Sequence, residues 1–163
     1  MQRPVSSISP GRQAIGLGVL IVSCFGAGLL GNWVTIPEIP TWYAELAKPA
    51  WNPPAWVFAP VWTVLYLMMA TAAWLVWRRA GWRAAWLPLG LFALQLVLNS
   101  LWTILFFGLQ RPDWAAVEIV FLGLAILLTL IAFLRRSALA ALLLLPYLAW
   151  VGFASVLNWT LWQ

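Results

Sequence analysis

The sequence predicts an all-α integral membrane protein: a bundle of five transmembrane helices with a short helical loop between the first and the second. Of the 163 residues, 64% are hydrophobic and 8% are charged, whereas about a quarter of the residues of a soluble domain carry a charge. The apolar residues also form five long uncharged runs, each near or above the ~20 residues that a helix needs to cross a bilayer. Continuous runs indicate helices, because the strands of a membrane barrel alternate over about ten residues.

These runs divide the chain into a short lead and one membrane domain. Residues 1–12 contain prolines, a glycine and serines and are expected to be disordered. Residues 13–163 form a single domain, in which a loop over residues 33–59 joins the first two spans. The expected spans cover residues 13–32, 60–77, 85–107, 113–134 and 138–161.

The first span carries small residues and the only cysteine of the chain. Its length exceeds the apolar core of a signal peptide, so we interpret it as a span. The pairs Ala14/Gly18 and Ala27/Gly31 have a spacing that lets helix backbones approach closely in lipid, either within the chain or between two copies. Cys24 is expected to be a buried packing residue.

Residues 40–66 concentrate aromatic rings and prolines as no other part of the chain does, in the stretch PTWYAELAKPAWNPPAWVFAPVWTVLY. Thr41 to Lys48 are expected to form two helical turns with Thr41 as N-cap. The stretch WNPPAW after these turns cannot form regular helix, because Pro53 and Pro54 remove two backbone donors and fix φ. Irregular backbone near the membrane must rest on protein, so we expect this stretch to fold over the mouth of the bundle.

The third span contains two amides, Gln95 and Asn99, that lie four residues apart and so share one helix face. Trp102 and Phe106 extend this face. Burying an amide without a partner costs free energy, so both amides should point into the bundle. There they would serve either as contacts between helices or as contacts to a ligand.

The last two spans add two acids and a further stripe. Asp113 suits the positive end of a helix dipole. Glu118 lies one turn further in, and its position near the interface favours a solvated side chain or a role in the N-terminal turn of the helix over a proton relay. A stripe on the fifth span fits either a pocket wall or ordinary packing: Tyr147, Trp150, Ala154 and Asn158.

The basic residues are scattered between the spans, which indicates membrane topology and argues against nucleic acid as a partner. One side of the membrane would carry the arginines of the N-terminus, of residues 78–83 and of residues 135–136, and the other side only Lys48 and Arg111. The positive-inside rule then places the N-terminus in the cytoplasm of a bacterial cell, with the first loop on the outer face.

The chain lacks residues that several kinds of enzyme need. The chain has no histidine and one cysteine, so neither a metal site nor a histidine-based triad is expected. Its four acids are too few for a convincing proton-coupled carrier. No cofactor is required by the sequence. Aromatic faces with a few amides are suited instead to a flat, mostly apolar ligand.

Three stretches, WYAELAKPAWNPPAWVFAPVWTVLY, QLVLNSLWTILFFG and PYLAWVGFASVLNW, together resemble the translocator protein family, also called TspO/MBR or tryptophan-rich sensory proteins. The resemblance covers roughly residues 15–160. It implies a five-helix bundle, commonly a homodimer in the lipid bilayer. It also implies that the first loop closes a pocket for porphyrins, sterols and synthetic benzodiazepine-site ligands.

The resemblance and the two polar faces together define the candidate ligand-binding residues. These are Trp42, Phe58, Trp62, Gln95, Asn99, Trp102, Trp114, Tyr147, Trp150 and Ala154. No residue has a firm catalytic role. In some bacterial members of the family, two tryptophans that match Trp62 and Trp150 are proposed to support light-dependent porphyrin breakdown.

The end of the chain departs from the animal members, which carry a proposed cholesterol motif of Leu/Val, Tyr and Lys/Arg in the last helix. Residues 157–163 have Trp in place of Tyr and no basic residue. A porphyrin, of the protoporphyrin or haem type, is therefore the expected ligand, in a role of transport, sensing or regulation. One alternative function is enzymatic, the light-dependent degradation of porphyrin. The second alternative is a sterol-binding or ligand-free membrane scaffold.

Overall fold

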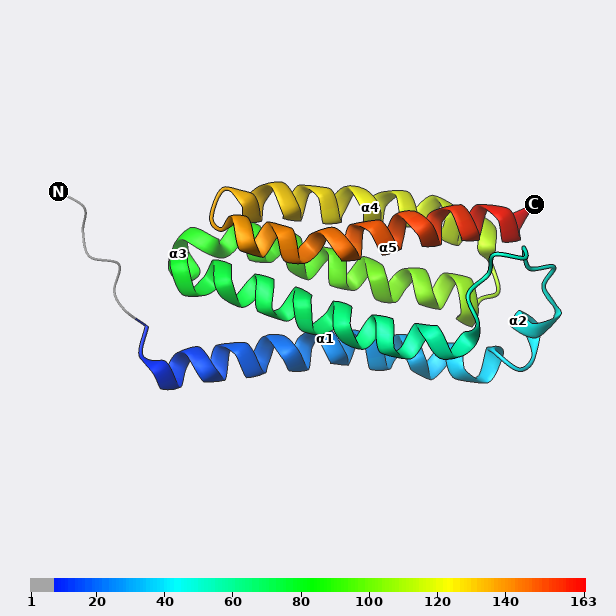
Figure 1. Cartoon of the computed structure of the whole chain (residues 1–163), viewed down its shortest axis with the longest axis horizontal. Coiled ribbons are helices and arrows are strands. Elements are labelled where there is room, and N and C mark those ends of the chain that lie inside the picture. The colour runs from blue at the N-terminus through cyan, green and yellow to red at the C-terminus, as the bar shows by residue number, and fades with distance from the viewer. Residues whose placement is uncertain (1–7) are drawn as a thin grey trace.

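The computed structural model describes residues 8–163, and these form a helical bundle with its longest helices side by side (Figure 1). The predicted disorder of residues 1–7 lies outside the described residues. The elements are α1 (Pro10–Glu38), α2 (Trp42–Glu45), the 3₁₀ turn η1 (Ala55–Val57), α3 (Phe58–Thr103), the π-helical turn η2 (Ile104–Gly108), α4 (Pro112–Leu134) and α5 (Ala138–Trp162).

Within residues 8–163, four helices are long and apolar enough to cross a membrane: α1, α3 with its flanking turns, α4 and α5. Many of their large apolar side chains are exposed on the outside of the bundle. A contiguous exposed apolar surface of this extent needs an apolar surrounding. The all-helical membrane class predicted from composition is therefore confirmed.

The 46-residue helix α3 reverses direction at Gly81, whose φ of 69° and ψ of 169° are not helical. Such angles are readily adopted by glycine alone. The first arm (residues 58–80) and the second arm (residues 82–103) consequently run antiparallel, next to each other (Figure 1). The arginines of residues 78–83 thus lie at a sharp reversal of one helical run, where a loop was expected.

The first helix is longer than predicted at both ends. Pro10 occupies the first turn, where a missing N–H costs nothing, so residues 10–12 are helical. At the other end Pro37 falls in the last turn and does not stop the helix, and Ile39 N still donates to the Thr35 carbonyl at 3.2 Å. The loop between α1 and α3 therefore covers residues 39–57, hereafter the 39–57 loop.

The predicted two-turn helix in this loop is wrong, because α2 contains only residues 42–45. Thr41 does not cap it. Its hydroxyl donates instead to the Pro37 carbonyl at 3.0 Å, which ties the residue back to α1.

Glycines bring α1 close to both arms of α3. A Cβ on Gly28 would lie 2.5 Å from the Tyr66 ring, and a Cβ on Gly31 would lie 3.2 Å from Thr103. Gly31 of the predicted Ala27/Gly31 pair thus serves packing within the chain, whereas a Cβ on Gly18 would meet nothing within 4 Å. Cys24 is fully buried, as expected.

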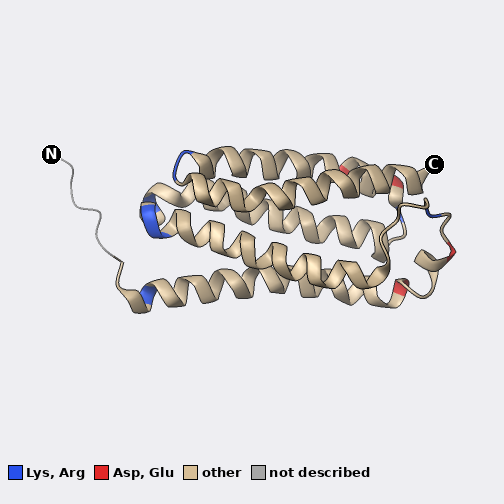
Figure 2. Ribbon diagram, viewed as in Figure 1, with Lys and Arg blue, Asp and Glu red and all other residues tan. Residues whose placement is uncertain are grey.

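Charge is segregated along the bundle (Figure 2). The arginines at the start of α1, in the α3 reversal and between α4 and α5 lie at one end, while the acidic residues lie toward the other end, near the 39–57 loop. Lys48 and Arg111 are the basic residues of this second end within the described chain.

Candidate functional site: a cavity beneath the 39–57 loop

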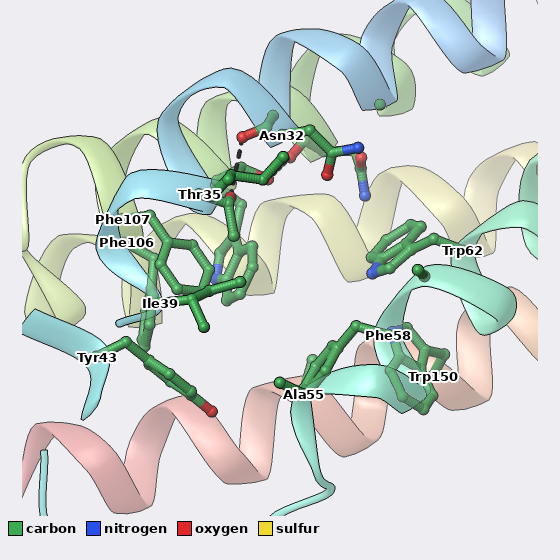
Figure 3. A pocket seen from close by; sticks show the side chains of 18 of the residues that line it. Asn32, Thr35, Ile39, Tyr43, Ala55, Phe58, Trp62, Phe106, Phe107 and Trp150 are labelled. Carbon is green, nitrogen blue, oxygen red and sulfur yellow. Dashed lines mark hydrogen bonds between the residues drawn. The ribbon is translucent and has the colours of Figure 1, made fainter. Parts of the chain in front are cut away.

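A cavity of about 390 Å³ lies between α1, both arms of α3 and α5, at the end of the bundle that the 39–57 loop covers (Figure 3). This volume falls within the range of roughly 300–1,000 Å³ that is usual for small-molecule pockets. α4 contributes no lining residue. The lining residues of α1, α3 and α5 are those toward the loop ends of these helices, so the cavity lies in the half of the membrane domain near the loop.

Aromatic rings dominate the lining. They are Phe25, Tyr43, Phe58, Trp62, Tyr66, Trp102, Phe106, Phe107 and Trp150. Several rings support one another: Phe58 and Trp150 have centroids 5.9 Å apart, and Trp62 and Tyr66 are 5.2 Å apart. The cavity thus offers ring faces held in place by neighbouring rings, and these are well suited to stacking.

Helical spacing explains which rings face inward. Phe58, Trp62 and Tyr66 follow one another at four-residue steps on the first arm and share one face. On the second arm the π-helical turn η2 carries an extra residue per turn, which shifts the helical phase. Adjacent residues Phe106 and Phe107 both line the cavity as a result.

A buried polar layer closes the inner end of the cavity. The Tyr66 hydroxyl donates to Asn99 Oδ1 at 3.2 Å, and Asn99 Nδ2 donates to the Tyr147 hydroxyl at 3.3 Å. Tyr66 and Asn99 line the cavity, while Tyr147 lies behind them and is 1% exposed. This layer joins both arms of α3 to α5 and presents an amide to any ligand above it.

A second amide holds the wall on the α5 side. Asn158 Oδ1 accepts a hydrogen bond from Trp102 Nε1 at 3.0 Å, and Asn158 Nδ2 donates to the Pro112 carbonyl at 2.8 Å. Asn158 therefore orients the Trp102 ring that lines the cavity and connects α5 to the start of α4.

The 39–57 loop rests on the cavity wall through its own rings. Trp42 packs edge-on against Phe106 with centroids 5.5 Å apart, and Tyr43 lies 5.6 Å from Phe107. The Tyr43 hydroxyl donates to Asn52 Oδ1 at 3.0 Å. Burial raises the pKa of Tyr43, so the hydroxyl stays protonated and able to donate.

Lys48 fastens the loop from within. Its Nζ donates to the carbonyls of Tyr43, Ala44 and Leu46 at 2.6, 2.9 and 3.1 Å. The ammonium thereby takes up carbonyls at the end of α2, where a cation is favourable. The sequence placed Lys48 in this loop but gave no sign of these contacts.

Six of the ten predicted site residues line the cavity: Phe58, Trp62, Asn99, Trp102, Trp150 and Ala154. They come from three different helical segments, and the structure brings them together. Two of the other four, Trp42 and Tyr147, lie directly behind lining residues, as described above.

Gln95 and Trp114 do not line the cavity. Gln95 points into the bundle, as predicted, and is 1% exposed, but it lies one helical turn beyond Asn99. Neither its Oε1 nor its Nε2 has a hydrogen-bond partner within residues 8–163. Trp114 is 54% exposed, and the Arg111 guanidinium lies over its ring, 4.7 Å from the centroid. The Trp114 side chain thus belongs to the outer surface of the bundle.

The expectation of a solvated Glu118 is wrong. The side chain is 6% exposed, and both carboxylate oxygens are buried without a partner among the described residues. Glu118 lies on the buried stripe of α4 with Ala115 and Leu122, at helical spacing. This spacing was visible in the sequence, and it was the signal from which the buried position of Glu118 could have been predicted.

The contribution of α1 to the cavity was not predicted from the sequence. Gly28, Asn32, Thr35 and Ile39 line the cavity at steps of three and four residues. The first span was expected to end at residue 32, and the residues after it were expected to be loop. The helical stripe that Thr35 and Ile39 continue could therefore not be recognised from the sequence.

Residues 20–163 match the model of the TspO/MBR family. The chain belongs to the TspO/MBR family. This TspO/MBR protein is 46% identical to the tryptophan-rich protein TspO of Chlorobaculum tepidum over 154 residues. The matched residues cover 93% of the chain and 97% of the relative. It is 44% identical over 138 residues to the translocator protein of Bos taurus, with 83% and 82% covered. The tryptophan-rich sensory protein of Cereibacter sphaeroides is 41% identical over 117 residues, with 72% of each chain covered.

These relationships confirm the resemblance drawn from the three sequence stretches. The family membership and the four apolar helices together establish an integral multi-pass membrane protein.

Proposed function

We propose that this TspO/MBR protein binds porphyrins and related flat apolar ligands in the cavity beneath the 39–57 loop, in a role of tetrapyrrole transport, sensing or regulation. The observation that carries the proposal is the cavity itself: about 390 Å³, walled by aromatic rings, with Asn99 at its inner end. Ring faces stack on a flat ligand, and the few amides can orient its polar substituents.

The membrane setting of the proposal is a five-crossing bundle in which each arm of α3 crosses once. The 39–57 loop acts as a lid on the outer face of a bacterial cell membrane, with the N-terminus in the cytoplasm and a second copy completing a homodimer. The segregation of arginines to one end supports this orientation. Relatives named translocator protein and tryptophan-rich sensory protein agree with a role in moving or sensing a small molecule.

Titration of the purified protein with protoporphyrin tests the binding proposal. We expect saturable quenching of tryptophan fluorescence and weaker binding for Trp150→Ala, which removes a lining ring. Trp86→Ala is the matched control, because Trp86 is an exposed ring on the second arm, near the α3 reversal at Gly81, and does not line the cavity. Equal affinities of the two variants and the unchanged protein would contradict the assignment of the cavity.

A comparison of metal-free porphyrin with haem tests how the ligand is held. The chain has no histidine, the commonest axial ligand of haem iron. We therefore expect both to bind with similar affinity, and an absorption spectrum of strongly ligated iron would contradict binding by the rings alone.

A second candidate function is light-dependent breakdown of the bound porphyrin. The observation that favours it is that Trp62 and Trp150 line the same cavity, so that both rings would contact one ligand. Illumination of the complex should then bleach the porphyrin faster than in detergent alone, and replacing both tryptophans by Phe should remove the difference. Equal bleaching with and without protein would eliminate this function.

A further inference from the structure

One side of the cavity is open to the outside of the bundle. Six exposed residues line the cavity along this side. Leu29, Asn32 and Ile36 belong to α1, and Ala55, Ala59 and Thr63 belong to the turn η1 and the first arm of α3. The first three are spaced by three and four residues, and the second three by four, so each set is one stripe of a helical surface. Because a buried wall would cover both stripes, they form the two edges of an opening, hereafter the side slot.

The side slot has a defined lower end. At Gly28 the α1 backbone meets the Tyr66 ring so closely that a Cβ would lie 2.5 Å from it. Beyond this contact, toward the loop, Leu29 and Ile36 of α1 are 68% and 64% exposed. The seven helical steps from Leu29 to Ile36 span about 10 Å along the helix at 1.5 Å per residue.

The surface around the side slot is apolar, as expected of a surface that faces lipid. Trp33 on α1 and Val64 on the first arm, neither of which lines the cavity, are large exposed hydrophobic residues, and only Cys24 and Gly31 of α1 are buried. The polar groups on the edges are Asn32 and Thr63. The Thr63 hydroxyl donates to the Ala59 carbonyl at 2.8 Å, whereas the Asn32 side chain makes no hydrogen bond to a described residue and lies across the cavity from Trp62 (Figure 3).

The loop end of the cavity is closed more firmly. Trp42 and Tyr43 pack on Phe106 and Phe107, and Lys48 fastens the loop through three carbonyls. A ligand that entered past the loop would have to break these contacts. The side slot requires no such rearrangement.

We propose that the side slot is the entrance through which an apolar ligand passes directly between the bilayer and the cavity, with Asn32 offering a hydrogen bond at its edge. The proposal rests on the proposed ligand binding. A flat ligand dissolved in lipid would enter edge-on between α1 and the first arm of α3, with the loop closed.

The test places a large ring in the slot and measures rates. Thr63→Trp is compared with Val64→Trp in the full chain in lipid nanodiscs, with protoporphyrin as the probe and stopped-flow fluorescence as the readout. Both positions are exposed and adjacent, but Val64 lies outside the cavity lining. We expect Thr63→Trp to slow association and dissociation together by roughly tenfold, as an obstructed passage does, and Val64→Trp to change neither rate.

Leu29→Trp provides an independent obstruction from the opposite edge, should Thr63→Trp fail to fold, and the same slowing of both rates is expected. Faster dissociation with unchanged association would mean that the new ring displaces bound ligand, and it would overturn the entrance. Unchanged rates in both slot variants, together with faster association in Lys48→Met, would place the passage at the loop and also overturn it. Absence of saturable porphyrin binding by the unchanged protein would instead refute the proposed function and the entrance with it.

Discussion

Asn99 joins three helical segments through one side chain. It accepts a hydrogen bond from Tyr66 and donates one to Tyr147, and all three residues are buried. Such a connected polar group is costly to remove, because its partners lose hydrogen bonds that water cannot replace. The inward direction of Asn99 was predictable from the cost of exposing an amide to lipid, whereas its two tyrosine partners were not.

Asn99→Ala should lower the free energy of unfolding by about 1–3 kcal/mol, since two buried hydroxyls lose their partner. Unfolding in detergent micelles, titrated with a denaturing detergent and followed by circular dichroism, measures the change. Thr71→Ala is the matched control, because Thr71 is half-buried and, within the described part of the chain, its hydroxyl donates only to the Leu67 carbonyl of its own helix. We expect that variant to stay within about 0.5 kcal/mol of the unchanged protein, and equal losses for both would contradict the role of the buried layer.

At the scale of elements, the contact between α1 and α3 depends on where glycines fall on α1. Gly28 faces the Tyr66 ring, while Gly26, half a turn away, faces open space. Small residues allow such close approach in lipid, where little else draws helices together. The glycine content of the first span was evident from the sequence, but which glycines are needed depends on the rotation of α1 about its axis.

Gly28→Ala should destabilise the protein by about 1–3 kcal/mol, because the new methyl group must displace a packed ring. Gly26→Ala should be neutral or slightly stabilising, since a Cβ there meets nothing within 4 Å and alanine favours helix. The same unfolding measurement compares the two. A larger loss for Gly26→Ala than for Gly28→Ala would contradict the packing of α1.

At the scale of the whole molecule, the two ends of the bundle differ in charge and in architecture. The end with the α3 reversal carries six arginines of the described chain: Arg12, Arg78, Arg79, Arg83, Arg135 and Arg136. The other end carries the acids, the cavity and the 39–57 loop. The candidate cavity therefore lies at the end that the positive-inside rule assigns to the outside.

Cysteine labelling in intact bacterial cells tests this orientation. In a Cys24→Ser background, a membrane-impermeant thiol reagent should label Ala50→Cys in the loop and should leave Ala84→Cys unlabelled until the membrane is permeabilised. Both positions are exposed on the protein, so accessibility reports the side of the membrane. Labelling of Ala84→Cys alone in intact cells would reverse the proposed orientation.

The sequence by itself determined the membrane class, the runs that form the helices, the inward direction of the amides and the family. These follow from local properties, because transfer of an apolar run into lipid depends on its length and composition. It also pointed to Trp62, Asn99 and Trp150, which spacing and resemblance placed on inward faces.

Only the tertiary structure decided which of the candidates meet around one space. Helix rotation buries Glu118 and leaves Gln95 a turn beyond the cavity, the π-helical turn brings in both Phe106 and Phe107, and the extension of α1 adds Asn32 and the edge of the side slot. Each of these depends on the phase and length of a helix relative to its neighbours. Such relations are set by packing between segments that are distant in sequence, and no single segment contains them.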